Sequence, residues 1–305
     1  MSIATDRIRA RMFAIGLLTA PDATRAEMLR AAQTTPAGNR RRILGTSIKV
    51  EKGEGERGVL TAVAYLSPAT ESGINLCPYA TAGCASACLG HSTGRLKMDC
   101  AKRARIAKAA WFTLDRAGFY RALDNEISKH AAKAVNKGLK PAVRLNGSSD
   151  IPWEKAHKID GLSLPERHPS VHFYDYTKAP LSARKPSANY TLCFSLSEAP
   201  GSHLRALEYL QAGHSAAMVV GGNVQNASLS EAKAVQTAML ESGTWAGFRT
   251  VDGDKHDFRD ASEAGAWVLL HAKGAALADR SGFVLRPGGL AFAHRRNRNA
   301  LLVLA

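Results

Sequence analysis

The sequence lacks the short motifs that identify several common enzyme classes. It contains no G-x-S-x-G elbow of the serine hydrolases and no phosphate loop of the Walker type. The Gly-Gly-Asn at Gly221 is too short for a dinucleotide-binding fingerprint. No paired-histidine nuclease motif and no basic-aromatic RNA-binding signature occurs. These absences argue against serine hydrolases, P-loop proteins, dinucleotide-binding proteins and the common RNA-binding modules.

Long apolar runs and a secretory leader pattern are missing as well. No run approaches the roughly 20 apolar residues that cross a bilayer. Residues 1–22 carry three arginines among their apolar residues, which is typical of an amphipathic helix. We therefore expect a cytoplasmic protein without a membrane partner, in which thiols stay reduced.

Acidic residues are few relative to basic ones. The 305 residues include 41 Lys and Arg against 26 Asp and Glu, a formal net charge of +15, with 45% hydrophobic residues. The length allows one large α/β domain or two small ones. The surplus positive charge favours an anionic partner such as a nucleotide or nucleic acid. Candidate phosphate contacts are the basic turn at 38–42 and the basic face formed by Lys97, Lys102, Arg103, Arg105 and Lys108.

Three of the five cysteines lie within twelve residues. Cys77, Cys84 and Cys88 are separated by six and then three residues. The residues between them are mostly small, which lets the backbone wrap closely around a bound group. Three thiolates on one short loop suit a metal ion or an iron-sulfur cluster, because both need several converging soft ligands.

The kind of metal centre stays open at this point. Structural zinc sites usually show paired CxxC knuckles, and none is present. Cys100, Cys193 or the His91 imidazole could add a ligand, which would close a zinc site or a fully ligated cluster. If only the three loop cysteines bind, a 4Fe-4S cluster keeps one iron open for a substrate or cofactor.

The chain pattern predicts an α/β protein in three parts. We expect an N-terminal helical and basic extension over 1–42, with Asp22 or Thr24 as a helix cap, and a basic C-terminal tail over 276–305. Between them, 43–275 would form a β/α domain that contains the cysteine loop. The charged, glycine-rich residues 51–58 predict a hairpin-type turn between two strands, and Gly118 predicts a break between two helices.

Short β-branched and aromatic runs alternate with helical patterns after residue 139. This alternation predicts parallel strands joined by crossover helices. About seven strands are expected, which suits a full or partial β/α (TIM-like) barrel, with a doubly wound open sheet as the alternative.

Polar side chains follow the ends of these predicted strands. Because parallel strands place their carboxyl ends at one edge, we expect these groups to share a pocket. The strand-end residues are Arg144, Asn146, Ser148, Ser149, Asp150, Tyr174, Tyr176, Thr177, Lys178, Ser195, Ser197, Glu198, Gly221, Gly222, Asn223, Asp252, Asp254, His256, Asp257, His271 and Lys273.

Five sequence blocks carry a family resemblance. CPYATAGCASACLG, RLNGSSDIPWE, FYDYTKAP, VDGDKHDFRD and LLHAKG resemble, in this order, the signatures of an uncharacterised family of tailed-phage proteins with a CPxAT-type three-cysteine loop. The resemblance covers roughly residues 43 to 275. It implies a phage protein that acts in the host cytoplasm.

A more distant similarity is to the radical S-adenosylmethionine barrels, which also carry a cysteine loop after the first strand. It implies that Cys77, Cys84 and Cys88 hold a 4Fe-4S cluster whose open iron binds S-adenosylmethionine, with an external electron donor. The gaps between the cysteines are longer here than in the CxxxCxxC motif of that superfamily, and Ala87 replaces its aromatic residue.

The leading hypothesis is therefore an iron-sulfur enzyme of radical type that acts on a nucleotide, nucleic acid or other anionic substrate. Arg144 and Lys178 would pair with negative groups, and Tyr176 or Cys193 would relay a proton or hydrogen atom. Asp150, Asp252 and Asp254 would hydrogen-bond sugar hydroxyls or amino groups. The expected catalytic residues are Asp150, Tyr176, Lys178 and Asp252, and the expected cofactor-binding residues are Arg144, Asn146, Ser149, Asp254 and Lys273.

The alternative is a phage nucleic-acid-binding or replication protein without catalysis. In this hypothesis the cysteines hold structural zinc together with Cys100 or His91. The net charge of +15 and the terminal HRRNR at 294–298 support it, because Lys and Arg clusters bind phosphates. A redox protein with cycling disulfides is a third possibility, although it lacks a CxxC motif.

Overall fold

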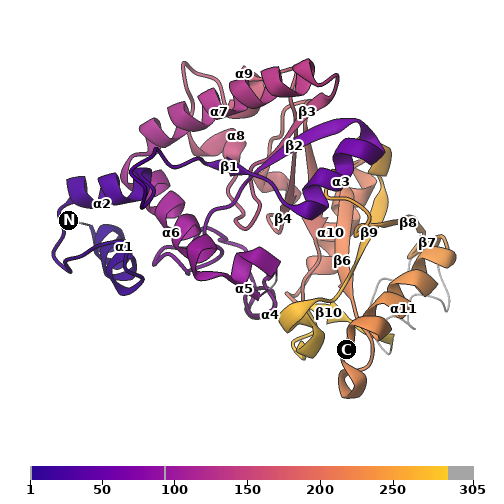
Figure 1. The fold of residues 1–305 in the computed structure, drawn as a ribbon. Coiled ribbons are helices and arrows are strands. Elements are labelled where there is room, and N and C mark those ends of the chain that lie inside the picture. The colour runs from indigo at the N-terminus through magenta and orange to yellow at the C-terminus, as the bar shows by residue number, and fades with distance from the viewer. Residues whose placement is uncertain (1, 93, 288–305) are drawn as a thin grey trace. The chain divides into compact units, whose positions relative to one another are not determined.

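The computed structural model describes residues 2–92 and 94–287 and shows a mixed α/β protein (Figure 1). In this part of the chain there are ten strands, most of them parallel to their neighbours. The described helices are too short or too polar to span a membrane. The chain forms two compact units, and each is described by itself.

The first unit contains Met1–Pro78, Gly94–Phe173 and Pro186–Tyr190. Strand β2 pairs antiparallel with β1 and parallel with β3, and β3 pairs parallel with β4. The elements are α1 (Ile3–Ala14), α2 (Arg25–Gln33), β1 (Leu44–Gly45), α3 (Ile48–Arg57), β2 (Val59–Ala64), η1 (Gly94–Lys97), α6 (Asp99–Leu114), α7 (Arg116–Asn136), β3 (Lys140–Arg144), α8 (Trp153–Ala156), α9 (Leu164–Arg167) and the start of β4 (His172–Thr177).

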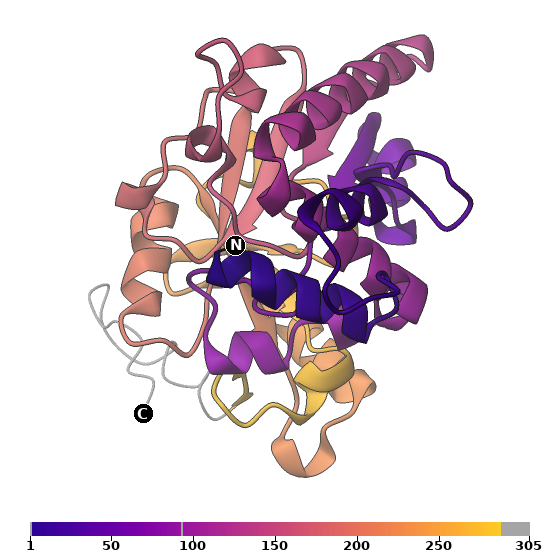
Figure 2. The ribbon, with the colours of Figure 1, turned by 90° about the vertical axis from the view of Figure 1, so that its left-hand side faces the viewer.

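Helices cover this part of the sheet. Helix α7 packs on β2 and β3 (Figure 1), and His130 Nε2 lies 3.0 Å from the Leu60 carbonyl and 3.1 Å from the Ala142 carbonyl. Since both carbonyls only accept, Nε2 carries the proton. The His130 imidazole therefore joins α7 to two neighbouring strands. Helices α1 and α2, the indigo helices of Figure 2, pack against α6.

The N-terminal helices predicted in 1–42 are present. Thr24 caps α2 in a reciprocal capping box with Glu27, so one of the two expected caps is confirmed. The long helical stretch divides at Asp115, which caps α7 by accepting from the Gly118 amide at 2.9 Å. The break therefore precedes Gly118, and this glycine lies in the first turn of α7.

Two local predictions in the first unit were wrong. Residues 48–57 form helix α3 instead of a hairpin turn, although β1 and β2 do pair antiparallel. Val50 is 3% exposed and α3 packs on β2, so burial of an apolar residue outweighs the low helix propensity of glycine. Arg105 and Lys108 are buried, so they do not belong to a solvated basic face.

The second unit contains Tyr79–Thr93, Tyr174–Lys185 and Thr191–Ala305. Its strand order is β5-β6-β9-β8-β7, and β10 pairs with β6. The elements are α4 (Ala82–Ser86), α5 (Leu89–Ser92), η2 (Leu181–Ala183), β5 (Tyr190–Ser195), α10 (Ser202–Gln211), β6 (Ser215–Val220), η3 (Val224–Asn226), α11 (Leu229–Glu241), β7 (Thr244–Trp245), β8 (Phe248–Asp252), η4 (Ala261–Glu263), β9 (Ala266–His271), η5 (Gly274–Ala278) and β10 (Val284–Leu285).

Parallel pairing gives the second unit one edge of carboxyl ends. Strands β5, β6, β9 and β8 run parallel, and only β7 runs antiparallel to its neighbour. Helix α10 joins β5 to β6, and α11 follows β6 and packs on β8 and β9. Part of the core consists of Cys193, Ala217 and Val268, with Tyr176 and Leu270 packed against them.

The α/β class and the parallel strands are confirmed. The seven strands expected from the sequence are β2, β3, β4, β5, β6, β8 and β9. The C-terminal tail expected from 276 begins inside η5 and contributes β10. Residues 288–305, which include HRRNR, lie outside the described part, as does the side chain of His91.

Candidate functional site

Cys77 lies beside the loop that follows β3 in the first unit. Its Sγ accepts a hydrogen bond from the Ala69 amide at 3.2 Å and lies 3.8 Å from the Ser148 carbonyl oxygen. The neighbouring Leu76 carbonyl accepts from the Asp150 amide at 2.9 Å. Two predicted site residues from successive strand ends, Cys77 and Asp150, are therefore on adjoining loops.

Asn146 shapes this loop from within. Its Oδ1 accepts from Ser149 Oγ at 2.9 Å, from the Ile151 amide at 2.9 Å and from Trp153 Nε1 at 3.0 Å. Its Nδ2 donates to the Ile151 carbonyl at 2.9 Å, and the residue is 1% exposed. Asn146 and Ser149 thus position the loop that carries Asp150. Arg144 is half-buried at the end of β3.

Cys84 belongs to the second unit, where it lies in α4. Thr81 caps this helix by accepting from the Cys84 amide at 3.1 Å. Glu198, which follows β5, accepts from Thr81 Oγ1 at 2.8 Å and from the Gly83 amide at 2.7 Å. A Cβ at Gly83 would lie 2.0 Å from Ser281 Oγ and 2.7 Å from Glu198 Oε1, so this close approach requires glycine. Glu198 thereby fixes Cys84 near the carboxyl end of β5.

Cys88 lies near the carboxyl end of β9. Its Sγ accepts from the Gly90 amide at 3.3 Å. The preceding Ala87 is 3% exposed and packs in one cluster with Ala272, which directly follows β9, and with Val284. A small side chain at 87 permits this packing. The second half of the cysteine loop therefore lies at the strand-end edge of its unit.

The chemistry of the donor set fits a soft metal centre. Cys77, Cys84 and Cys88 are thiols of intermediate exposure, whereas Cys100 is exposed and Cys193 is buried. Amide hydrogen bonds to thiolate sulfur, such as those to Cys77 and Cys88, tune iron-sulfur clusters. Among the residues that the structure describes, no three His, Cys, Asp or Glu side chains converge on one metal position. The metal centre therefore stays a prediction.

A polar network joins the ends of β8 and β9. Asp254 accepts from Lys273 Nζ at 2.6 Å and from the His271 amide at 2.9 Å, and its Oδ2 lies 2.7 Å from His271 Nδ1. Gln236 Nε2 donates to Asp252 Oδ1 at 3.0 Å and to Asp254 Oδ2 at 3.1 Å. The structure therefore brings together three predicted residues, Asp252, Asp254 and Lys273, through Gln236, which the sequence did not single out.

The His271 imidazole is oriented by two acceptors. Its Nδ1 lies 2.9 Å from Gln236 Oε1 and 2.7 Å from Asp254 Oδ2, so Nδ1 carries the proton. Burial lowers the pKa of His271, and the charge of Asp254 opposes this effect without overcoming it. In the neutral imidazole, Nε2 then has a lone pair. A histidine held in one tautomer by a carboxylate is an arrangement suited to general base chemistry.

Tyr176 and Lys178 are also held by neighbours in the second unit. Arg259 Nε donates to the Tyr176 hydroxyl at 2.7 Å, and Arg259 Nη1 donates to Glu263 Oε1 at 2.7 Å. Lys178 Nζ donates to Ser195 Oγ at 2.7 Å and to its carbonyl at 3.0 Å. Arg259 is 1% exposed and was missed, because an arginine in a charged loop resembles a solvated residue.

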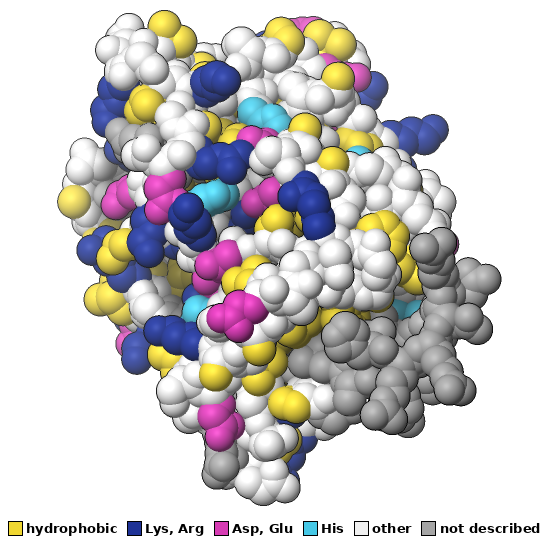
Figure 3. Space-filling view, turned by 90° about the vertical axis from the view of Figure 1, so that its right-hand side faces the viewer, with side chains coloured by type: hydrophobic (Ala, Val, Ile, Leu, Met, Phe, Trp, Pro, Cys, Tyr) yellow, Lys and Arg dark blue, Asp and Glu magenta, His cyan; other side chains and the backbone are white. Residues whose placement is uncertain are grey.

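The predicted strand-end residues thus form separate local groups. Cys77, Asn146, Ser149 and Asp150 meet in the first unit, and Asp252, Asp254 and Lys273 meet in the second. Charges of both signs also mix on the surface. Figure 3 shows a face on which Lys and Arg side chains lie among Asp and Glu side chains.

The fold is that of an α/β protein in which hydrogen-bonded polar groups lie at the carboxyl ends of parallel strands. The family model described as Gene product 88 matches residues 28–287, and the chain belongs to this family. This match fits the tailed-phage resemblance and extends beyond the residues 43 to 275 expected for it. No curated protein and no solved structure matches the chain.

Proposed function

We propose that this protein is an iron-sulfur enzyme in which Cys77, Cys84 and Cys88 are the ligands of a 4Fe-4S cluster. The observation that supports it best is the pair of hydrogen bonds from Thr81 and Gly83 to Glu198. They fix the segment of Cys84 at the carboxyl end of a parallel strand. This edge is where α/β proteins bind ligands and do chemistry.

The finer parts of the proposal follow from the radical S-adenosylmethionine similarity. The strands would belong to a full or partial β/α barrel, and an open iron would bind S-adenosylmethionine. Such a cluster supplies one-electron chemistry when an external donor reduces it. The reducing cytoplasm of a phage host would keep the three thiols available.

The chain's own residues would bind an anionic substrate and move a proton. Lys273, whose side chain is 34% exposed, offers positive charge beside Asp254. His271 Nε2 accepts a proton while Asp254 and Gln236 hold the Nδ1 proton. Tyr176, Lys178 and Asp150 remain proposed substrate contacts in this scheme. Proton transfer is thereby assigned to His271, which sequence reasoning named only as a strand-end residue.

The test is metal analysis of protein purified without oxygen. We expect about four irons and about four sulfides per chain, the stoichiometry of one cubane cluster, in the native protein and in Cys100→Ser. Cys84→Ser should lose them. An unchanged iron content in Cys84→Ser would overturn the ligand assignment. Loss of iron in Cys100→Ser would show that Cys100 is a fourth ligand, which contradicts the proposal that one iron of the cluster is open. A content of one zinc per chain without sulfide would contradict the enzyme proposal and support the alternative, a zinc-stabilised nucleic-acid-binding protein.

A Glu198→Gln variant tests the supporting observation separately. The amide keeps the size of the side chain but removes the charge that accepts from the Thr81 hydroxyl and the Gly83 amide. We expect faster cluster loss in air and faster thiol modification of the apoprotein than in the native protein. Equal rates would show that Glu198 does not hold the cysteine loop.

A further inference from the structure

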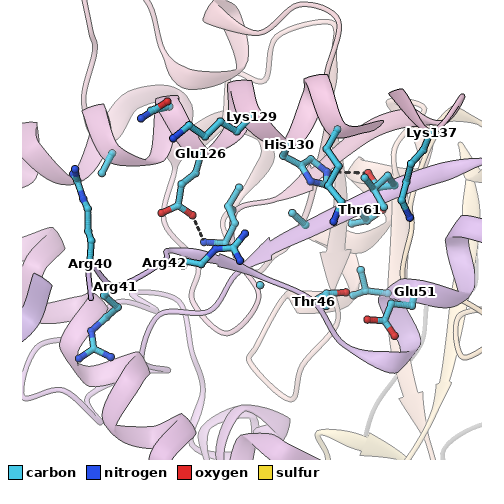
Figure 4. A pocket seen from close by; sticks show the side chains of 18 residues that line it. Arg40, Arg41, Arg42, Thr46, Glu51, Thr61, Glu126, Lys129, His130 and Lys137 are labelled. Atoms are coloured by element: carbon cyan, nitrogen blue, oxygen red, sulfur yellow. Dashed lines mark hydrogen bonds between the residues drawn. The ribbon is translucent and has the colours of Figure 1, made fainter. Parts of the chain in front are cut away.

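The first unit contains a groove unrelated to the cysteines. It has a volume of about 870 Å³ and lies between α7, the segment 40–46, the start of α3 and β2 (Figure 4). Its lining carries six basic side chains and only two glutamates. The basic side chains are Arg40, Arg41, Arg42, Lys129, Lys133 and Lys137.

One of the two glutamates is engaged with the backbone. The Glu126 carboxylate accepts from the Ile43 amide at 2.9 and 3.0 Å and from the Leu44 amide at 2.9 Å. Lys108 Nζ donates to the Ile43 carbonyl at 3.2 Å. These bonds fix the segment that carries the arginines beside α7. Glu126 thus helps to build the groove, because its carboxylate accepts hydrogen bonds from the backbone amides of the arginine segment.

The arginines of this segment differ in role. Arg41 is 7% exposed and donates to the carbonyls of Ala32 and Thr34 at 2.9 and 2.5 Å, so it stabilises the fold. Arg40 and Arg42 are exposed at the groove. The Arg40 guanidinium carbon lies 5.6 Å from the centroid of the Trp111 ring, a cation–π contact that holds this group in place, and Arg42 adds a second guanidinium group on this side.

The lysines on the opposite side form a row. Lys129 and Lys133 on α7 and Lys137 at its C-cap are spaced four residues apart, and all three are exposed. At a rise of 1.5 Å per residue, their positions repeat about every 6 Å along one side of the helix. A regularly charged polymer matches such a row better than a single phosphate group does.

A threonine with a buried hydroxyl lies at the groove floor. Thr61 of β2 lines the groove and is 7% exposed, and its Oγ1 has no hydrogen-bond partner within the described residues (Figure 4). Buried hydroxyls in native proteins are almost always paired. The Thr61 hydroxyl oxygen has less than 1 Å² of accessible surface, so a ligand in the groove would contact the basic side chains before it contacts Thr61.

The lining also indicates which part of a nucleic acid would bind. None of the described residues around the groove is aromatic, so bases have no stacking platform there. The imidazole of His130 is committed to the carbonyls of Leu60 and Ala142 and adds no base-reading donor. Contacts to phosphates position a nucleic acid without reading its sequence.

We propose that this groove binds the phosphodiester backbone of a nucleic acid, independently of base sequence. The proposal does not rest on the iron-sulfur cluster, because none of the described residues that line the groove is a cysteine. It narrows the anionic partner to a polymer of phosphates and assigns it a place in the fold. The enzyme proposal can therefore fail while this one holds.

The test compares two charge reversals in the full chain. Lys133→Glu changes the groove, and Lys158→Glu changes an exposed lysine of the same unit that does not line it. Binding of two unrelated fluorescein-labelled 20-nucleotide DNAs is measured by anisotropy at several salt concentrations. We expect Lys133→Glu to weaken the binding of both DNAs about tenfold and to lower the slope of log affinity against log salt concentration by about one unit. The affinities of Lys158→Glu should stay near those of the native protein.

Other outcomes overturn the proposal. Equal weakening by both variants would indicate general attraction to a basic surface, and a strong preference for one DNA would indicate base reading. Displacement of DNA by millimolar inorganic phosphate would identify a single-phosphate site. A Thr61→Val variant, which keeps the side-chain shape, should weaken binding less than Lys133→Glu without changing the salt slope. A Cys84→Ser protein without iron should bind DNA like the native protein.

Discussion

Lys108 of α6 makes the stability of the first unit depend on pH in the alkaline range. Burial, reinforced by the positive charge of Arg41, lowers the pKa of Lys108 from 10.5 to about 8 in the folded state. The unfolded chain therefore binds more protons than the folded chain between about pH 8 and 10.5. The free energy of unfolding must rise with pH across this window, and the destabilisation by the buried charge is fully present below it.

The size of the effect follows from the shift. At 1.36 kcal/mol per pKa unit, the buried ammonium costs about 3 kcal/mol below pH 8. In a Lys108→Met variant this cost disappears, while the hydrogen bond to the Ile43 carbonyl, worth about 1 kcal/mol, is lost. We expect the variant to be about 2 kcal/mol more stable than the native protein at pH 7.

Urea unfolding followed by circular dichroism at pH 7, 8, 9 and 10 provides the assay. Other lysines and tyrosines titrate in both proteins, so the difference between the two unfolding free energies isolates Lys108. This difference should fall by about 3 kcal/mol from pH 7 to the alkaline end. Lys158→Met, which replaces an exposed lysine of the same unit, serves as the control. A pH-dependent difference for Lys108→Met that is no larger than the one for Lys158→Met would refute the reasoning.

Two further predictions concern a glycine and the strand-end histidine. Gly73 has φ +89°, and a Cβ there would lie 2.7 Å from the Arg7 carbonyl oxygen, whereas Gly138 at φ +69° has open space. Chemical denaturation should show that Gly73→Ala costs at least about 2 kcal/mol more than Gly138→Ala, for which about 1 kcal/mol is expected; equal costs would contradict this. Asp254→Asn should lower the pKa of His271 further, since the Asp254 charge opposes the desolvation that lowers it. An NMR titration that shows a raised or unchanged pKa would count against the assignment of the pair.

Local patterns in the sequence were sufficient to predict most elements but not every connection. Short β-branched and aromatic runs identified the seven longer strands, because strands in a parallel sheet are covered on both faces and are apolar over most of their length. Helix α3 was missed, since the pattern of glycine and charge is local whereas the burial of Val50 against β2 is not. The strands β1, β7 and β10 have two residues each, too few to show any periodicity.

The sequence predicted where the polar residues of the candidate site lie better than it predicted which residues they contact. Polar residues after strands were expected at one edge, and Asp252, Asp254 and Lys273 do meet there. Their connection depends on Gln236, which lies on α11 and contacts residues 16 to 35 positions away in the sequence. No local pattern distinguishes this glutamine from a solvated helix residue, because only the packing of α11 on β8 and β9 turns it toward them.

The basic groove shows why net charge could suggest an anionic partner but could not locate it. Lysines four residues apart are visible in the sequence, yet Glu126 precedes them and would be expected to neutralise Lys129 by an i,i+3 contact. In the structure its carboxylate accepts from the amides of Ile43 and Leu44. These hydrogen bonds hold the arginine segment opposite the lysines. The grouping of basic side chains in the groove therefore depends on contacts between residues 82 and 83 positions apart in the sequence.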